Sequence, residues 1–218
     1  MEDINFINKF TNSLVIEENR YSCLMMAILD ARKLSGRNPG SGKQEYDFLV
    51  SKNSFLNPNS FIGIISYLII LDMIGEIFIK KGMSFGKKSK NKKIEKALKQ
   101  FGGSISEQDI DVIVSLRNSL AHNYGLINSP WCDDENDRKR HKFTLINDER
   151  SFLIKYPVGN KWNGDFKDKS KDSSTEVSVY NLIEVVYVNL KSDIEKNKVE
   201  LALNKGVDEL KARFSIMY

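Results

Sequence analysis

The sequence predicts a mainly α-helical protein: an up-and-down bundle of helices with one β-hairpin inserted near residues 142–155. Three observations lead to this fold class. Apolar residues recur at spacings of three and four along most of the chain, as on one face of a helix. Clusters of Gly, Pro and Asn separate these stretches, and short strand-like runs occur near 142–155. The 218 residues suffice for one core, so we expect a single domain over 1–218, with an insertion of hairpin and loops at about 130–175.

The N-terminal third is expected to be helical. Residues 17–34 carry one apolar stripe, and the Gly- and Pro-rich residues 36–42 end that helix. A shorter helix is expected at about 44–51. A break at 57–60 then precedes the long apolar helix 61–79, which we expect at the centre of the core.

The middle of the chain predicts two further helices. A Gly- and Lys-rich loop at 82–91 leads into a helix at 92–101 with its apolar residues on one side. Residues 104–107 read Ser-Ile-Ser-Glu, a capping-box pattern that marks a helix start. The apolar positions that follow run up to His122, and Gly125 can end the helix.

Beyond Pro130 the pattern changes. A charged loop at 133–140 is followed by two expected strands, 143–146 and 151–154, joined by a turn at 147–150. We expect a polar loop at 160–174. The last segment, 176 to about 214, is expected to be helical, with a kink near Asn197 or Gly206.

Composition restricts the class of protein. With 41% hydrophobic and 28% charged residues and a net charge of +4, the chain resembles an ordinary soluble domain and not a polycation. The two cysteines, Cys23 and Cys132, lie far apart without a Cys-x-x-Cys pattern. This argues against a zinc site or a disulfide scaffold and fits a reducing, cytoplasmic location.

Neither a secretory signal nor a membrane span is expected. The chain starts with acidic residues, whereas a signal peptide starts with basic ones. In the apolar stretch 61–79, Asp72 and Glu76 interrupt the second half, and charges there would be costly in a bilayer. We therefore interpret this stretch as a buried core helix.

The richest chemistry lies in residues 117–124, at the end of a predicted helix. Histidine moves protons near neutral pH, and arginine holds phosphate oxygens with a planar fork of donors, so Arg117 and His122 suit a phosphodiester. Asn118 and His122, four apart, share a helix face, but Arg117 and His122 are five apart and diverge. One helix alone cannot focus both on one phosphate unless its end unwinds. A second subunit could supply the convergence, so we expect a homodimer with a composite site.

The pattern Arg117-Asn118-x-x-x-His122 resembles the signature of the HEPN superfamily. The resemblance implies a four- or five-helix bundle that dimerises, with two motifs facing each other in a basic cleft. Many members are metal-independent endoribonucleases of toxin–antitoxin and antiphage systems, whereas others are non-catalytic binding modules. Both alternatives apply here: an endoribonuclease, or a module that binds RNA, nucleotide or a protein partner.

The resemblance also implies residue roles. His122 would act as general base on the ribose 2′-hydroxyl, Arg117 would stabilise charge on the phosphate oxygens, and Asn118 would orient the base or the phosphate. The product would carry a 2′,3′-cyclic phosphate, DNA would not be cut, and no metal or cofactor would be needed.

Tyr124 extends the resemblance. His122-Asn123-Tyr124 fits the His-x-Tyr pattern of HEPN toxins paired with nucleotidyltransferase-like antitoxins, where the tyrosine can be modified with AMP. This implies Tyr124 as a modification or regulatory site and such an antitoxin as a partner. The alternative is a tyrosine that packs its ring at a helix end.

A basic run lies between Lys80 and Lys99, with nine lysines against one acidic residue, Glu95. A local excess of this size can steer RNA through phosphate contacts without reading sequence. We expect the RNA-binding lysines to be Lys87, Lys88, Lys90, Lys92 and Lys93. The alternative is a solvated loop and helix face.

Acids on an apolar helix are costly unless paired. Asp72 or Glu76 is therefore expected either to support Arg117 or His122, or to be capped by a helix or exposed at a dimer surface. No metal site is expected, because Cys132, Asp133, Asp134 and His141 match no ligand spacing. Residues 36–43 are not a phosphate-binding loop, because their glycine spacing is one too long and Gln44 replaces the magnesium-binding Ser or Thr.

Overall fold

The computed structural model describes residues 2–35, 37–43, 61–80, 82–83, 85, 93–123, 125–128, 140–146, 153–196, 201–203 and 206–217. The chain divides into two compact units. Unit 1 is Met1–Gly103 with Ile183–Tyr218, and unit 2 is Ser104–Leu182. The long helix α7 (Val179–Lys196) starts in unit 2 and continues into unit 1.

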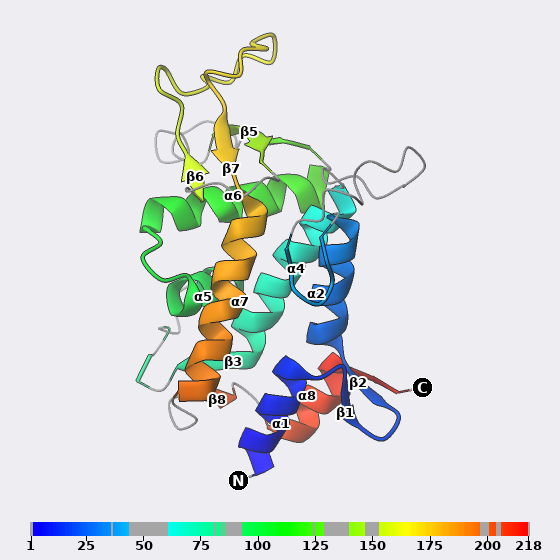
Figure 1. Ribbon diagram of the computed structural model, residues 1–218. Coiled ribbons are helices and arrows are strands. Elements are labelled where there is room, and N and C mark those ends of the chain that lie inside the picture. The colour runs from blue at the N-terminus through cyan, green and yellow to red at the C-terminus, as the bar shows by residue number, and fades with distance from the viewer. Residues whose placement is uncertain are drawn as a thin grey trace, which may run out of the picture. The chain divides into compact units, whose positions relative to one another are not determined.

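Unit 1 is built around one apolar helix. This helix, α4 (Phe61–Ile77), packs against α2 (Cys23–Leu34) and α5 (Lys93–Phe101) (Figure 1). α4 is apolar nearly all round, and most of its side chains are buried among its neighbours, although Ile62 and Ile69 are exposed. At Gly75 a Cβ would lie 1.8 Å from a backbone oxygen of α5, so glycine permits the close approach of the two helices.

The remaining elements of unit 1 surround that core. They are α1 (Glu2–Asn12), β1 (Val15–Glu17), β2 (Arg20–Ser22), β3 (Phe78–Lys80), β8 (Leu201–Leu203), α8 (Val207–Phe214) and β9 (Ser215–Met217). The strands form a three-stranded sheet of order β1-β2-β9 and a two-stranded β3-β8 ladder, with antiparallel pairs throughout. Ser22 caps α2: its side chain accepts from Met25 N at 3.2 Å and donates to Phe10 O of α1 at 2.7 Å.

Unit 2 combines one helix with a four-stranded sheet. The helix α6 (Glu107–Asn123) packs against β4 (Ile127–Asn128) and β5 (His141–Leu145). The sheet has the order β4-β5-β7-β6, with β6 at Ile154–Lys155 and β7 at Thr175–Val177. The β5–β7 pair is parallel and the other two pairs are antiparallel.

The predicted fold class is wrong: the chain is mixed α/β. Among the described residues there are seven helices, with a helical content of 53%, and sheets of three and four strands. The strands of these sheets are two to five residues long. Runs this short leave almost no alternating pattern, so the sequence signal came from the helices. The expectation of a single domain over 1–218 stays a prediction.

The expected hairpin is also wrong in its pairing. β5 covers most of the expected first strand, whereas β6 shares only Ile154 with the expected second strand, 151–154. β7 lies between β5 and β6 and pairs with each. β7 spans Thr175–Val177, although the sequence predicts that the last helix starts at 176. The expected turn at 147–150 lies outside the described residues. A non-local strand of three residues therefore replaces the local contact that the hairpin would make.

Two predicted helices are shorter than expected. Residues 15–22 form the β1–β2 pair, turning at Asn19 with a φ of 56°, so the helix predicted at 17–34 begins only at Cys23. The segment 176–214 is not one helix, because α7 ends at Lys196 and β8 and α8 follow. Gly206, one of the two proposed kink positions, lies directly before α8 as its N-cap.

Three helices agree with the sequence to within two residues: α4, α5 and α6. The helix expected at 44–51 and the break at 57–60 lie outside the described residues. Within the described part of the chain, no helix combines the length and apolarity that crossing a membrane requires.

Candidate functional site

The motif residues Arg117, Asn118 and His122 all belong to one continuous helix, α6. Ser106 starts this helix, because its Oγ accepts from Asp109 N at 3.1 Å. Two acidic residues in the first turn, Glu107 and Asp109, match the positive end of the helix dipole. The helix thus starts within the predicted residues 104–107, but Ser106 caps it, two residues later than the Ser104 N-cap of the expected capping box.

The end of α6 is fastened to the sheet through Ser119. This serine is fully buried, and its hydroxyl lies 2.8 Å from Gly125 O and 2.7 Å from Ile127 O. Gly125 N in turn donates to Ser119 O at 3.4 Å, and Phe143 N of β5 donates to Leu126 O at 2.7 Å. The turn after the motif is thus bonded back to α6 on one side and to β5 on the other.

The helix holds the motif residues at fixed angular positions. Leu116 and Leu120 are fully buried, whereas Arg117 and Asn118 are partly exposed. At 100° per residue, position 118 lies about 40° from position 122, and position 117 lies about 140° from it. The helix continues through His122 to Asn123, so its end does not unwind within the motif.

The side chain of His122 and all of Tyr124 lie outside the described residues. Their contacts are therefore not part of the site as described, and the role of Tyr124 stays a prediction. Since positions 117 and 122 diverge on an intact helix, one copy of α6 does not by itself bring the two side chains to one point. The expectation of a composite site stays a prediction on this ground.

The two acids of α4 hold the start of α5. Ile94 N donates to Asp72 Oδ1 at 3.1 Å, and Lys93 Nζ lies 2.9 Å from Glu76 Oε2. Asp72 therefore accepts from a backbone N–H in the first turn of α5, as a capping carboxylate does. These contacts lie within unit 1 and correspond to the helix-capping alternative for Asp72. Support of the motif by either acid stays a prediction.

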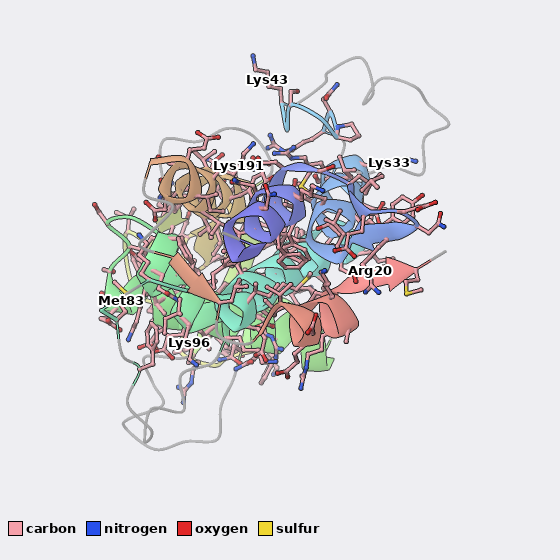
Figure 2. All side chains as sticks on the ribbon, turned by 90° about the horizontal axis from the view of Figure 1, so that it is seen from below. Arg20, Lys33, Lys43, Met83, Lys96 and Lys191 are labelled. Carbon is pink, nitrogen blue, oxygen red and sulfur yellow. The ribbon has the colours of Figure 1, made fainter. Side chains whose placement is uncertain are left out.

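The basic run is partly neutralised where the structure describes it. Lys80 pairs with Asp193 at 2.6 Å and Lys99 with Glu95 at 2.9 Å, in addition to the Lys93–Glu76 pair. Lys96, labelled in Figure 2, places its Nζ 5.6 Å from the centre of the Phe85 ring. Outside the described residues lie the other expected RNA-binding lysines, Lys87, Lys88, Lys90 and Lys92.

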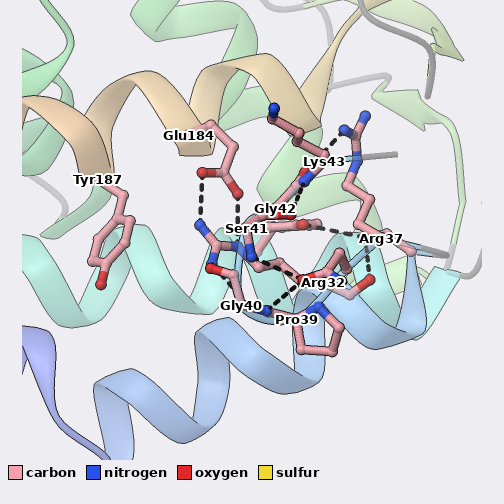
Figure 3. A network of polar contacts seen from close by, with 12 residues as sticks. Arg32, Arg37, Pro39, Gly40, Ser41, Gly42, Lys43, Glu184 and Tyr187 are labelled. Atoms are coloured by element: carbon pink, nitrogen blue, oxygen red, sulfur yellow. Dashed lines mark hydrogen bonds and ion pairs between the residues drawn. The ribbon is translucent and has the colours of Figure 1, made fainter. Parts of the chain in front are cut away.

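The Gly-rich turn at 37–43 is built around an arginine, as Figure 3 shows. The buried Arg32 guanidinium donates to Pro39 O at 2.9 Å and Gly40 O at 3.0 Å. Its other edge donates twice to the Glu184 carboxylate, at 2.9 Å each. The loop thus presents carbonyl oxygens inward to a cation, the opposite of the N–H groups with which a phosphate-binding loop holds an anion.

Sequence reasoning missed a pocket in unit 2. It has a volume of about 240 Å³, and α6, β5 and the segment after β6 supply its lining residues Glu107, Gln108, Asp111, Val112, His141, Tyr156 and Lys161. The only sequence signal was weak: polar side chains at 107, 108 and 111 on one side of α6. For His141 the sequence predicts no role beyond the rejected metal site.

Two aromatic side chains of this pocket are held in place. His141 is buried, with Nδ1 3.1 Å from Thr175 Oγ1 and its ring stacked on Phe143 at 5.3 Å. Tyr156 donates its hydroxyl to Asp109 Oδ1 at 2.8 Å. Burial, and then this hydrogen bond, raise the pKa of Tyr156, so it stays a neutral phenol in the physiological range.

Among the described residues, no group of three or more His, Cys, Asp or Glu side chains could hold a metal ion. Cys132, Asp133 and Asp134 lie outside those residues. The candidate functional groups are therefore the side chains of α6 and those that line the neighbouring pocket. Comparison with family models, with curated proteins and with solved structures finds no match for this chain.

Proposed function

We propose that the protein is a metal-independent endoribonuclease of HEPN type whose catalytic residues are Arg117, Asn118 and His122. The observation that carries the proposal is the location of all three on one continuous helix whose end Ser119 fixes. The resemblance of the motif to the HEPN signature supports it. The proposal rests on this local motif, since the expected helical bundle is replaced by a mixed α/β fold.

The proposed reaction needs only side-chain chemistry. His122 takes the proton of a ribose 2′-hydroxyl, and the 2′-oxygen attacks the adjacent phosphorus. The bond from phosphorus to the 5′-oxygen breaks, and that oxygen takes a proton from an imidazolium or from water. Arg117 stabilises charge on the non-bridging oxygens, and Asn118 orients the phosphate. The products are a 2′,3′-cyclic phosphate and a 5′-hydroxyl.

The geometry of α6 favours a homodimer as the active species. Positions 117 and 122 diverge by about 140°, so a second copy would supply the partner group for each. Size-exclusion chromatography with light scattering measures the oligomeric state of the active protein and so tests the dimer proposal. A strictly monomeric protein that cleaves RNA would contradict the dimer proposal but not the proposed roles of the residues.

The proposed biological role is that of a cytoplasmic toxin or antiphage effector. An antitoxin such as a nucleotidyltransferase-like protein is a partner to look for, with Tyr124 as the modified residue. Expression of the wild type in bacterial cells should arrest growth, and expression of H122A should not. Equal growth of both strains would remove the toxin proposal.

The catalytic proposal is tested by RNA cleavage in EDTA with wild type, R117A, N118A and H122A. We expect H122A and R117A to lose at least about a hundredfold in rate, as removal of a general base or an oxyanion donor does. R213A, at an exposed Arg on α8, is the matched control and should cleave as wild type does. Equal cleavage by all variants would overturn the assignment. RNA binding without cleavage by the wild type would favour the non-catalytic module instead.

A further inference from the structure

The pocket in unit 2 lies on the same side of α6 as two motif residues. Its lining residue Asp111 lies within about 20° of positions 118 and 122 around the helix axis. Along the axis, positions 111 and 118 are about 10 Å apart at 1.5 Å per residue. This equals about three nucleotides of a stacked strand at 3.4 Å each. A short single strand can therefore touch the pocket and the motif at once.

The pocket combines an aromatic ring with apolar surface. Tyr156, which is partly exposed, contributes an accessible aromatic face, and the buried side chains of His141 and Val112 lie behind it in the pocket wall. The Tyr156 hydroxyl is already bonded to Asp109. This hydrogen bond holds the tyrosine ring in position and leaves the face of the ring available for stacking. Aromatic side chains of this kind stack on the bases of single-stranded RNA.

The polar groups of the pocket are mainly acceptors. Glu107 and Asp111, one helical turn apart, bring two carboxylates to the pocket, and Lys161 brings an ammonium group. An ionised carboxylate only accepts hydrogen bonds, and an ammonium group only donates them. Within the described part of the chain, no hydrogen bond or ion pair satisfies the Asp111 carboxylate. A fitting ligand therefore has adjacent N–H donors and a nearby carbonyl oxygen.

We propose that this pocket binds the guanine base of single-stranded RNA. This inference rests on the proposed function and names the base that is read beside the scissile phosphate. Guanine presents N1–H and N2–H₂ side by side, which suit a carboxylate, with O6 next to them for an ammonium group. Uracil has a single N–H on that edge, and adenine and cytosine each pair their amino group with an acceptor nitrogen. A volume of about 240 Å³ suits one base and not a base pair.

The test is the affinity of the full chain for four mononucleotides, measured by isothermal titration calorimetry. We expect GMP to bind at least about tenfold tighter than AMP, CMP or UMP, the size of one good bidentate contact. D111N should lose this preference, and E107Q should weaken it. D30N, the same change at an exposed position of α2, should keep it. Far-UV circular dichroism verifies that each variant is folded.

The outcomes separate this inference from the nuclease. Equal affinity for the four nucleotides, or an unchanged preference in D111N, overturns the guanine pocket even if the protein cleaves RNA. Guanine preference that depends on Asp111 in a protein that cleaves no RNA supports the pocket and overturns the nuclease. In the active enzyme, cuts should map within about three nucleotides of a guanine, and D111N should cut without that bias.

Discussion

Ser119 connects the fold of unit 2 directly to the motif on α6. Its buried hydroxyl reaches two carbonyl oxygens, Gly125 O and Ile127 O, that follow the helix end. The S119A substitution removes the donor that both of these partly buried oxygens share. We therefore expect lower stability and a less rigid end of α6, the part of the helix that includes His122.

The size of the effect follows from the contacts. Leaving a buried acceptor without its donor costs about 1–3 kcal/mol, and we take about 2 kcal/mol for two partly buried oxygens that lose one shared donor. Alanine returns about 0.5 kcal/mol through its helix propensity. The net loss is about 1.5 kcal/mol. In a chain of this length, that lowers the Tm by about 3–6 °C.

The matched control is S115A. Ser115 is also buried on α6, one turn earlier, and the described residues offer its hydroxyl no hydrogen-bond partner. S115A should therefore be as stable as wild type or slightly more so. Urea and thermal unfolding of both variants measure the difference, and RNA cleavage should fall in S119A only. If S119A and S115A unfold at the same midpoint, the fastening of the helix end is refuted.

Three further predictions concern stability. E184Q leaves the Arg32 guanidinium buried without its counter-charge and should cost about 3 kcal/mol in urea unfolding, since only 8% of that side chain is exposed; wild-type stability would contradict this. G75A forces a Cβ to within 1.8 Å of a backbone oxygen of α5 and should lower the Tm sharply or abolish soluble protein, and an unchanged Tm would contradict the close approach. The Ser173 hydroxyl, with a neighbouring backbone N–H and a lysine, lowers the pKa of Asp168 to about 2. Because this pKa lies below the usual 3.8, the ionised Asp168 stabilises the fold above about pH 4, and this stabilisation is lost as the pH falls toward 2. D168N should therefore remove that part of the acid unfolding transition, followed by tryptophan fluorescence. An unaltered transition in D168N would contradict the role of Asp168.

The helices were predictable where the apolar pattern is strong and local. α4, α5 and α6 each span at least nine residues, with clear breaks or caps before them, and the sequence locates them to within two residues. The strands were not predictable in the same way. β7 has three residues, and it joins β5 in a parallel pair across some thirty residues of chain. No local pattern encodes such a contact, so the sequence favoured the nearer and wrong partner, β6.

The same distinction holds for the site. The motif on α6 was visible because Arg117, Asn118 and His122 lie within six residues of one helix. The neighbouring pocket was not visible, because Asp111, His141 and Tyr156 come from three separate segments that only the sheet brings together. His141 is buried by the pairing of β5 with the distant β7, whose Thr175 contacts its Nδ1.

The central claim is that His122 activates a ribose 2′-hydroxyl. The most direct measurement is cleavage in EDTA of an RNA oligonucleotide and of the same oligonucleotide with one 2′-deoxy sugar at the cut site. The claim predicts a 2′,3′-cyclic phosphate from the first, no cut at that site in the second, and no product from either with H122A. Cleavage at the deoxy position, or a full rate with H122A, would contradict it.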